Sequence, residues 1–198
     1  RGGYITPGFI DIHIHGSNGS DVMDARMSSL ENISTFLAGN GTTSWLATTM
    51  TVSIPEIKNA LHAVSDYMQD KSHKGAQILG AHLEGPFLNP LAKGAHVEEY
   101  IIPPSTESFE KITGETPDIV RLVTMAPESD GALEFARYLK DRKITAAIGH
   151  TKATYEQCAD AMEHGMTHIC HFYNAMTPLN HREPGAVGAI LDNDSATI

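Results

Sequence analysis

The chain has 198 residues, of which 41% are hydrophobic, and its 24 acidic and 14 basic residues give a formal net charge of −10. This length and apolar content suffice for one large domain with a buried core. The acidic balance and the lack of a lysine or arginine cluster argue against nucleic-acid binding, and no apolar run is long enough to cross a bilayer. Two cysteines, Cys158 and Cys170, do not make a disulfide framework. The composition predicts a soluble cytoplasmic protein.

Segments of strand and helix character alternate along the chain. Apolar runs predict six strands, at residues 8–14, 42–49, 77–84, 119–125, 144–149 and 167–172. Helices are expected between them. Three helix starts carry a capping-box pattern, at Ser28 with Glu31, Ser53 with Glu56, and Thr154 with Gln157. Gly41 and Gly165 stand where helices should end.

This alternation predicts an α/β fold with a parallel sheet, either closed into a barrel or doubly wound. No G-x-G-x-x-G motif or P-loop follows any strand, and chemically reactive residues follow several strands rather than one. Active sites of (β/α)₈ barrels form at the carboxyl ends of several strands. We therefore expect a TIM-type barrel.

A closed barrel has eight strands, and this chain supplies only about the first six. The segment "SATI" at Ser195–Ile198 is expected to begin a seventh. Residues 1–6 are expected to be a trace of a flanking segment, and residues 7–198 a partial barrel domain. Because the first residue is arginine and the barrel is incomplete, we expect these residues to be part of a longer protein.

The first strand, in "GFIDIHIHG", ends in two histidines one residue apart. Alternate residues of a strand face the same side, so His13 and His15 share a face with Asp11, while Ile12 and Ile14 take the other. Two imidazoles on one face suit a metal ion, whose remaining ligands must come from elsewhere in the chain.

Further candidate ligands stand at three other strand ends, namely Glu84 in "GAHLEGPF", His150 in "IGHT" and His171 in "HICHFYNAM". Gly85 and Pro86 predict a sharp exit that presents the Glu84 carboxylate. Four imidazoles and one carboxylate suit Zn²⁺ or Fe²⁺, and their long separations predict a site assembled by the tertiary fold. The set matches either two metals bridged by Glu84 or one metal with spare histidines. Both arrangements point to metal-assisted hydrolysis.

The remaining histidines have weaker sequence contexts. His82 shares a strand face with Glu84 and is expected to orient a ligand. Structural or surface positions are expected for His62, His73, His164 and His168.

Four segments together resemble one family. "PGFIDIHIHG", "GAHLEGPFLNPLAKGAH", "IGHT" and "HFYNAMTPLNHREPGAVGA" are similar to segments of the N-acetylglucosamine-6-phosphate deacetylases of the amidohydrolase superfamily. The similarity runs from Pro7 to Ile198. Glutamate at the end of strand three distinguishes this family from dihydroorotase-like relatives, which place a modified lysine on strand four. Strand four here, "IVRLVTMAPE", contains no lysine.

The resemblance implies an enzyme that hydrolyses N-acetylglucosamine 6-phosphate to glucosamine 6-phosphate and acetate by attack of a metal-bound hydroxide. His13 and His15 would hold one metal ion, Glu84 would bridge to the second or hold it, and His150 and His171 would complete that second site. The implied cofactors are therefore two divalent ions, zinc or iron. The family also tends to form homodimers.

The resemblance further assigns substrate contacts. His96 in "KGAH" matches a position near the substrate amide, and Asn174 and Ala175 in "NAM" match sugar- and phosphate-binding positions, Ala175 through its backbone. Arg182 in "HREPG" matches the phosphate-binding arginine, with His181 beside it. A guanidinium fork suits phosphate oxygens, and a chain of net charge −10 needs a local cation to bind a sugar phosphate.

The chain also departs from the family pattern. The family's catalytic aspartate follows strand eight and a substrate-binding histidine follows strand seven, and Asp192 and Asp194 precede the seventh strand. The 198 residues by themselves are therefore expected to be inactive. Two alternatives remain open. One is a non-catalytic protein that binds metal or sugar phosphate, and the other is a different amidohydrolase, such as a deaminase or cyclic amidase.

Overall fold

The computed structural model describes residues 3–198, and residues 1 and 2 of the expected flanking trace lie outside the described residues. At its centre is a six-stranded sheet in which all neighbouring strands are parallel. The strands, in spatial order, are β1 (Phe9–Ile14), β4 (Thr42–Thr48), β5 (Gln77–Glu84), β6 (Val120–Met125), β7 (Thr145–Ile148) and β8 (His168–Ile169). Two short antiparallel strands follow β1, namely β2 (Gly16–Ser17) and β3 (Ser20–Asp21).

Helices connect the successive strands of the sheet. The α-helices are α1 (Met27–Gly39), α2 (Ile54–Gln69), α3 (Thr106–Thr113), α4 (Ala132–Asp141), α5 (Tyr155–Glu163) and α6 (Gly185–Leu191). Short 3₁₀ helices lie in the connections, at η1 (Val22–Asp24), η2 (Pro90–Ala92), η3 (Glu98–Tyr100) and η4 (Pro117–Ile119).

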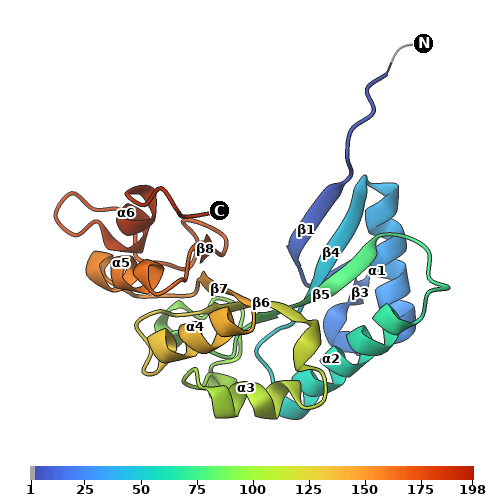
Figure 1. The fold of residues 1–198 in the computed structure, drawn as a ribbon, viewed down its shortest axis with the longest axis horizontal. Helices are drawn as coiled ribbons and strands as arrows, with labels where there is room; N and C mark the ends of the chain where they lie inside the picture. Colours follow the sequence, from blue (N-terminus) through green and yellow to red (C-terminus); the bar gives the residue numbers. More distant parts are fainter. Residues whose placement is uncertain (1–2) are drawn as a thin grey trace.

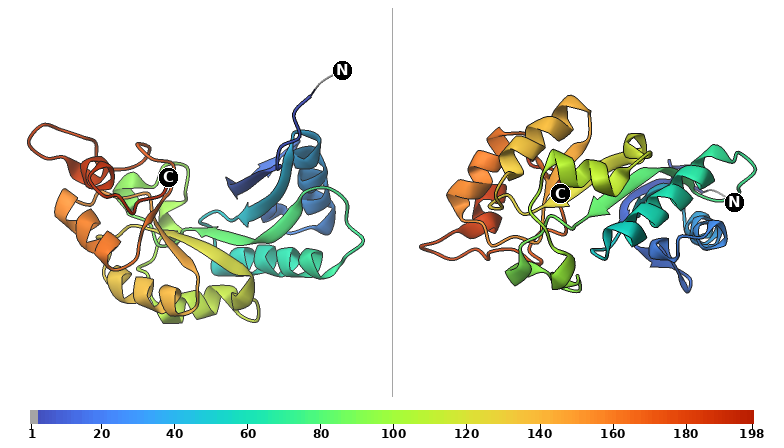
Figure 2. Two further views of the ribbon diagram at one scale, coloured as in Figure 1. Left: turned by 45° about the horizontal axis from the view of Figure 1, so that its top comes forward. Right: turned by 90° about the horizontal axis from the view of Figure 1, so that it is seen from below.

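The sheet is curled, with helices α1 to α5 on its outer face (Figure 1, Figure 2). The strands are neighbours in the order in which they occur in the chain, and β1 and β8 form the two edges. Parallel strands in sequential order with helices outside are the arrangement of a (β/α) barrel. The expectation of the first six strands of such a barrel is confirmed.

Large apolar side chains fill the space between the sheet and the outer helices. On β4, Trp45 is fully buried and its indole N–H donates to Ser34 Oγ of α1 over 3.1 Å. Leu46, the next residue, instead belongs to a small cluster with Leu122 and Ala147. Strand alternation thus sends one residue outward to the helices and the next into the barrel interior, where the polar strand ends also point.

Two of the three predicted capping boxes form, at Ser53 with Glu56 and at Thr154 with Gln157. The prediction for Ser28 with Glu31 is wrong, because α1 begins after Arg26 and has no side-chain cap. Glu31 instead accepts a hydrogen bond from the hydroxyl of Tyr67 on α2, at 2.8 Å. The Glu31 carboxylate therefore accepts a hydrogen bond from a residue distant in the chain and does not cap the start of α1.

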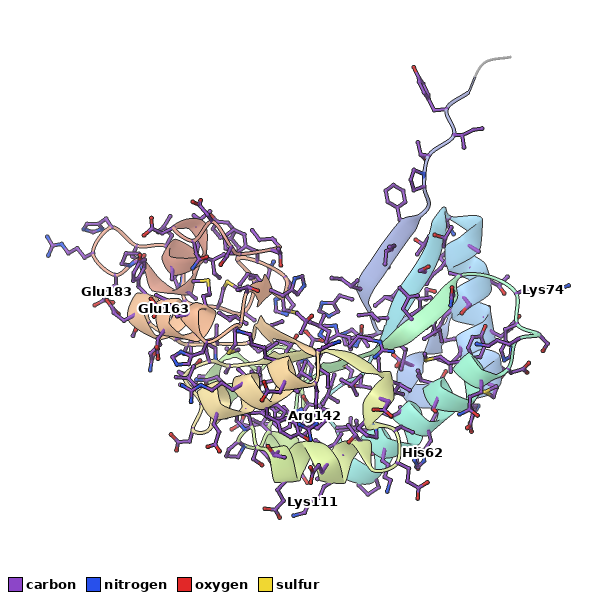
Figure 3. The ribbon with its side chains drawn as sticks, viewed as in Figure 1. His62, Lys74, Lys111, Arg142, Glu163 and Glu183 are labelled. Atoms are coloured by element: carbon purple, nitrogen blue, oxygen red, sulfur yellow. The ribbon has the colours of Figure 1, made fainter. Side chains whose placement is uncertain are left out.

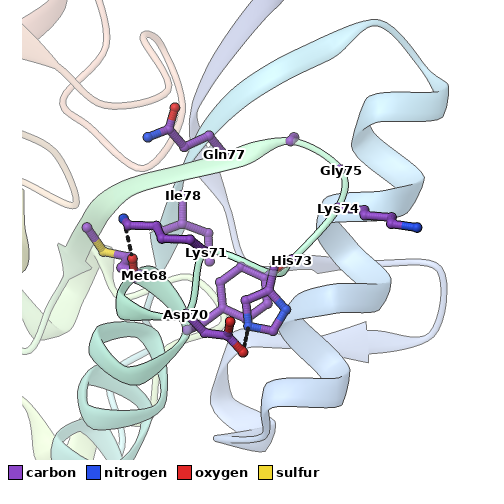
Figure 4. A pocket seen from close by; sticks show the side chains of 10 residues that line it. Met68, Asp70, Lys71, His73, Lys74, Gly75, Gln77 and Ile78 are labelled. Atoms are coloured by element: carbon purple, nitrogen blue, oxygen red, sulfur yellow. Dashed lines mark hydrogen bonds and ion pairs between the residues drawn. The ribbon is translucent and has the colours of Figure 1, made fainter.

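Glu31 belongs to a polar clasp at the amino-terminal end of the sheet, opposite the strand ends that carry the candidate ligands. His73 stacks on the ring of Tyr67, with centroids 3.7 Å apart, and its Nδ1 lies 2.7 Å from Glu31 Oε2. Its Nε2 lies 3.4 Å from Asp70 Oδ2, and Figure 4 marks this ion pair with a dashed line. The clasp ties the end of α2 to α1, and this end of a barrel commonly contributes stability rather than chemistry.

The last strand is shorter than expected. The prediction of a strand over 167–172 is corrected to β8 at His168–Ile169, because the backbone turns into the left-handed region at His171. Thr197 forms a parallel bridge with His168, as expected for the opening of a seventh strand. Within residues 3–198, every helix is too short or too polar to cross a membrane.

Gly80 provides a test of the sheet geometry. It lies in β5 at φ +154, where an added Cβ would stand 2.4 Å from the Ile119 carbonyl oxygen. Gly80→Ala is therefore expected to destabilise the fold by about 1–3 kcal/mol. The measurement is urea unfolding followed by the fluorescence of Trp45, the single tryptophan.

The matched control for this test is Gly39→Ala at the end of α1. No atom lies within 4 Å of its added Cβ, so this change is expected to be neutral or to stabilise by up to about 1 kcal/mol. Equal unfolding midpoints for the two variants would contradict the strand geometry described here.

Candidate metal centre

The centre of the candidate site is the carboxylate of Glu84, the last residue of β5. Its side chain is 2% exposed. Nε2 of His13 lies 3.1 Å and Nε2 of His15 lies 2.8 Å from Oε2. Nε2 of His150 and of His171 each lie 3.2 Å from Oε1. All five predicted ligands therefore converge, and each carboxylate oxygen faces its own pair of imidazoles.

In three of these rings, the backbone carbonyl that contacts Nδ1 determines which nitrogen carries the proton. Nδ1 of His15 faces the Thr48 carbonyl at 3.3 Å, Nδ1 of His150 the Ala92 carbonyl at 2.8 Å, and Nδ1 of His171 the Asn174 carbonyl at 3.0 Å. A carbonyl oxygen only accepts hydrogen bonds, so Nδ1 must donate in each case. In the neutral rings the lone pair of Nε2 therefore points into the cluster.

In this arrangement the Nε2 lone pairs of the neutral rings face the carboxylate oxygens of Glu84, which are also hydrogen-bond acceptors. Within the described residues, Glu84 Oε2 is buried without a proper hydrogen-bond donor, although His15 Nε2 is only 2.8 Å away. Nε2 of His150 and of His171 are also 3.0 Å apart. Such contacts require a cation or protons between the atoms. Two nitrogens bound to one tetrahedral zinc ion lie about 3.4 Å apart, so the residues present fit a divalent metal.

Protons balance the carboxylate when no metal is bound. Burial opposes charge on His13, but hydrogen bonds with Cys170 and Glu84 outweigh it and raise the pKa of this imidazole to about 10. Hydrogen bonds with the same two groups raise the pKa of His171 to about 10. Burial would raise the pKa of Glu84, yet the surrounding imidazoles hold it far below its usual range. The carboxylate therefore stays ionised.

His96 is aimed at the same carboxylate but differs from the four ligands. It is 4% exposed, and its Nε2 lies 3.6 Å from Glu84 Oε2. Its Nδ1 accepts a hydrogen bond from the backbone N–H of Thr51, at 3.1 Å. The neutral ring must therefore carry its proton on Nε2, which makes His96 a hydrogen-bond donor into the site rather than a metal ligand.

His82 supports the cluster from behind. It is 1% exposed, and burial, followed by the positive charge of His13, lowers its pKa to about 3. Its Nε2 lies 2.7 Å from Thr124 Oγ1, and its ring lies edge to face against His13 with centroids 4.8 Å apart. The structure thus places His82 against one of the predicted ligands.

The backbone bends sharply at two of the ligands. His150 and His171 have φ of 47° and 32°, in the left-handed region that side chains with a Cβ rarely adopt. Such a conformation costs on the order of 1–2 kcal/mol per residue. The bends occur two residues beyond the ends of β7 and β8, and they turn both imidazoles toward Glu84.

Two features of the site were not foreseen. Asp11 was expected on the histidine side, but its Oδ1 accepts from the backbone N–H of His13 at 3.0 Å, and the β1 register shifts between Asp11 and Ile14. Cys170, which the sequence analysis left without a role, has its Sγ 3.3 Å from His13 Nδ1 and 3.6 Å from Glu84 Oε1. Its place beside His171 in the chain was the only sequence signal for this contact.

The predicted substrate contacts are not all brought together. Asn174 and Ala175 follow His171 in the turn after β8, where the Asn174 carbonyl holds the His171 ring. Arg182 and His181 are exposed on a projecting loop beside Glu183, which Figure 3 labels. Arg182 lines a recess of about 420 Å³ with Lys152, which precedes α5, and none of the cluster residues lines it.

A second recess lies between β1 and β8, the two edges of the sheet. It has a volume of about 620 Å³ and is lined by His13, His15 and His171, together with Phe172 and Ile198.

A curled parallel sheet with outer helices, whose carboxyl-terminal strand ends gather four imidazoles around one buried carboxylate, defines an α/β-barrel-type protein with a candidate metal site. The chain belongs to the amidohydrolase family, a metal-dependent family whose model matches residues 4–194.

Individual relatives are similar over nearly the whole chain. The N-acetylglucosamine-6-phosphate deacetylase of Bacillus subtilis (strain 168) is 45% identical, over 96% of this chain and 48% of that protein. The N-acetylgalactosamine-6-phosphate deacetylase of Escherichia coli O157:H7 is 38% identical, over 97% of this chain and 51% of that protein. The chain thus spans about half the length of the curated relatives it matches.

Solved structures give the same picture. A variant of N-acetyl-D-glucosamine-6-phosphate deacetylase from Mycobacterium smegmatis, in complex with N-acetyl-D-glucosamine-6-phosphate, matches with a TM-score of 0.90 and 32% identity. The match covers 96% of this chain and 49% of that one.

Competition between protons and metal is directly testable. Because the pKa values of His13 and His171 are raised to about 10, the protons on both rings must leave when a metal binds at neutral pH. The apparent Zn²⁺ affinity is expected to rise with pH up to about 10 and to level off above it. Titration calorimetry in buffers of different ionisation enthalpy would measure at least one proton released per metal.

The raised pKa values of His13 and His171 also affect the stability of the metal-free fold, which falls with rising pH whereas the metal affinity rises. Raised histidine pKa values stabilise the metal-free fold fully below the ordinary value of 6.5, and this contribution is lost as pH rises through about 10. His73→Ala, in the distant clasp, is the control and should leave proton release unchanged. Metal binding without proton release would contradict the charge state described for the cluster.

Proposed function

We propose that this chain forms the metal centre and part of the substrate site of an enzyme that deacetylates an N-acetylhexosamine 6-phosphate, N-acetylglucosamine 6-phosphate in the first place, releasing acetate. The observation that carries this proposal is the set of imidazole lone pairs directed at the buried Glu84 carboxylate. The named activities of the similar proteins supply the substrate class.

The proposed cofactors are two divalent ions, zinc or iron. His13 and His15 face one carboxylate oxygen, whereas His150 and His171 face the other, so Glu84 can bridge two positions. A bound divalent ion supplies Lewis-acid polarisation of the amide carbonyl and a water of lowered pKa. The protein's own task is to hold the four Nε2 atoms toward the carboxylate and to shield the carboxylate from water.

His96 is proposed to orient the amide. Its Nε2–H is fixed in direction by the backbone N–H of Thr51 on Nδ1, and it points at the Glu84 carboxylate from the loop after β5. A preorganised donor at this place can bind the amide oxygen and stabilise the negative charge that develops on it. The charge accumulates only as the bond to the nucleophile forms, so the contact strengthens in the transition state.

The proton acceptor is not among the residues of this cluster. Within residues 3–198, Glu84 is the single carboxylate in the groups able to hold a metal, and Asp192 accepts a hydrogen bond from the Tyr155 hydroxyl instead. We therefore propose that these 198 residues bind metal but hydrolyse the amide poorly by themselves. A protein that binds metal or sugar phosphate without hydrolysis is the second candidate, because the same cluster can hold a metal in either case.

Phosphate binding is proposed for Arg182, with His181 beside it and the Asn174–Ala175 turn contributing to the sugar. Arg182 lines a recess with Lys152, and Glu156 and Glu183 line the same recess. The guanidinium fork of Arg182 suits the oxygens of a phosphate dianion. A homodimer and a cytoplasmic location accompany the proposal as expectations from the resemblance.

The decisive experiment compares acetate release and metal content in the protein at its natural length. Glu84→Gln removes the negative charge that four imidazoles face, so most of the metal should be lost and acetate release should fall by at least about 10³-fold. N-Acetylglucosamine 6-phosphate, its galactosamine epimer and unphosphorylated N-acetylglucosamine are the substrates to compare.

Glu31→Gln is the matched control, because it makes the same chemical change at the opposite end of the sheet. It should keep both metal and activity. Metal binding without acetate release from any of these sugars would exclude the enzyme hypothesis and leave the hypothesis of a binding protein. Full activity of the metal-depleted Glu84→Gln variant would exclude a metal-dependent mechanism.

His96 separates orientation of the substrate from metal binding. His96→Ala is expected to leave metal content unchanged and to lower kcat by roughly 10²–10³-fold, the usual effect of losing one preorganised donor. His96→Gln, which restores an N–H donor, should recover part of that loss. A fall in metal content in His96→Ala would instead make His96 a ligand.

A further inference from the structure

The four ligand histidines are not held alike. His15, His150 and His171 each donate their Nδ1–H to a backbone carbonyl, which no side-chain substitution can remove. Nδ1 of His13 instead faces a side chain, the thiol sulfur of Cys170, at 3.3 Å. The Nδ1 hydrogen bond of one candidate ligand therefore depends on a side-chain atom that can be replaced, while its ring also packs against His82.

Cys170 is built into the cluster. The residue is 3% exposed, and its sulfur also lies 3.6 Å from Glu84 Oε1. A carboxylate oxygen only accepts, so the S–H proton points to Glu84 and the sulfur is left to accept from His13. Two hydrogen bonds therefore follow one another. His13 Nδ1–H donates to the Cys170 sulfur, and the S–H group of Cys170 donates to Glu84 Oε1.

We propose that Cys170 is a positioning residue that fixes the His13 ring with its Nε2 lone pair toward Glu84 and thereby sets the occupancy of the metal position formed by His13, His15 and Glu84. This inference rests on the proposed two-metal centre. It assigns the thiol an orienting role on His13 and no direct bond to the metal.

At the position formed by His13 and His15, the contact geometry supports orientation rather than ligation. On the other side of the carboxylate, the sulfur lies within 4.8 Å of ligand atoms of Glu84 and His171, so a direct bond to metal there is the alternative that the experiment must separate. The sulfur approaches Nδ1, the nitrogen of His13 that points away from the Glu84 oxygen, while Nε2 makes the 3.1 Å contact with Oε2. The sulfur also lies nearest Oε1, whereas His13 and His15 face Oε2. Residues that orient a ligand histidine in this way commonly change metal affinity by 10- to 100-fold when they are replaced.

The experiment titrates Zn²⁺ into the natural-length protein and into Cys170→Ala, Cys170→Ser and His15→Ala, with metal per chain measured after dialysis. His15→Ala identifies which binding step belongs to the position on the Oε2 side. Cys170→Ala should weaken that step by about 10- to 100-fold and leave the other step unchanged. Cys170→Ser, whose hydroxyl both accepts and donates, should stay within about 10-fold of the parent.

Cys158→Ala is the matched control, since Cys158 is the other buried thiol and belongs to the apolar core on α5. It should leave both steps unchanged. The cobalt-substituted protein adds a spectroscopic readout, because a direct sulfur–cobalt bond gives a charge-transfer band that an orienting thiol does not.

The outcomes separate this inference from the proposed function. Equal affinities for Cys170→Ala and the parent, a failure of serine to rescue, or a sulfur–cobalt band lost in Cys170→Ser would each overturn the positioning role. A parent that binds only one metal would overturn it as well. Metal binding with the expected Cys170 pattern but no acetate release would overturn the enzyme and leave the positioning role standing.

Discussion

A single buried carboxylate organises this molecule. Glu84 stands at the end of a central strand, almost free of solvent, and cannot be buried as an anion without positive charge around it. The fold meets this demand with imidazoles from three other strand ends, each turned so that Nε2 faces a carboxylate oxygen. In the proposed metal centre, protons and metal ions would compete for the same space, which would link charge state, metal content and stability in one site.

The sheet makes this convergence possible because one of its faces packs against the helices while the other carries the polar residues of the site. Outward-facing side chains such as Trp45 and Leu83 pack against helices, whereas inward-facing ones such as His82 and Glu84 point into the interior. A change on one face therefore leaves the other largely intact. The clasp around His73, at the opposite end, stabilises the same strands without entering the chemistry.

Sequence patterns predict that five polar side chains converge, because parallel strands bring their carboxyl ends to one edge and make residues far apart in the chain neighbours. The structure brings these five together, namely His13, His15, Glu84, His150 and His171, and their role as metal ligands stays a prediction. The patterns could not reveal the proton positions, because the carbonyls of Ala92 and Asn174 that fix them carry no residue signature. Ser28 and Glu31 failed as a cap because a tertiary contact to Tyr67 outweighed a local one. Cys170 was missed since a lone cysteine has no pattern.

The left-handed backbone at His150 and His171 has a consequence for any attempt to improve this protein. At such positions glycine or asparagine relaxes the chain, so a laboratory selection that rewards heat resistance alone favours replacing these two residues. The variants it yields would unfold at a higher temperature but would lack two of the four imidazoles in the candidate metal site. Stability and metal binding therefore place opposite demands on the same two residues, and a useful selection must test for both.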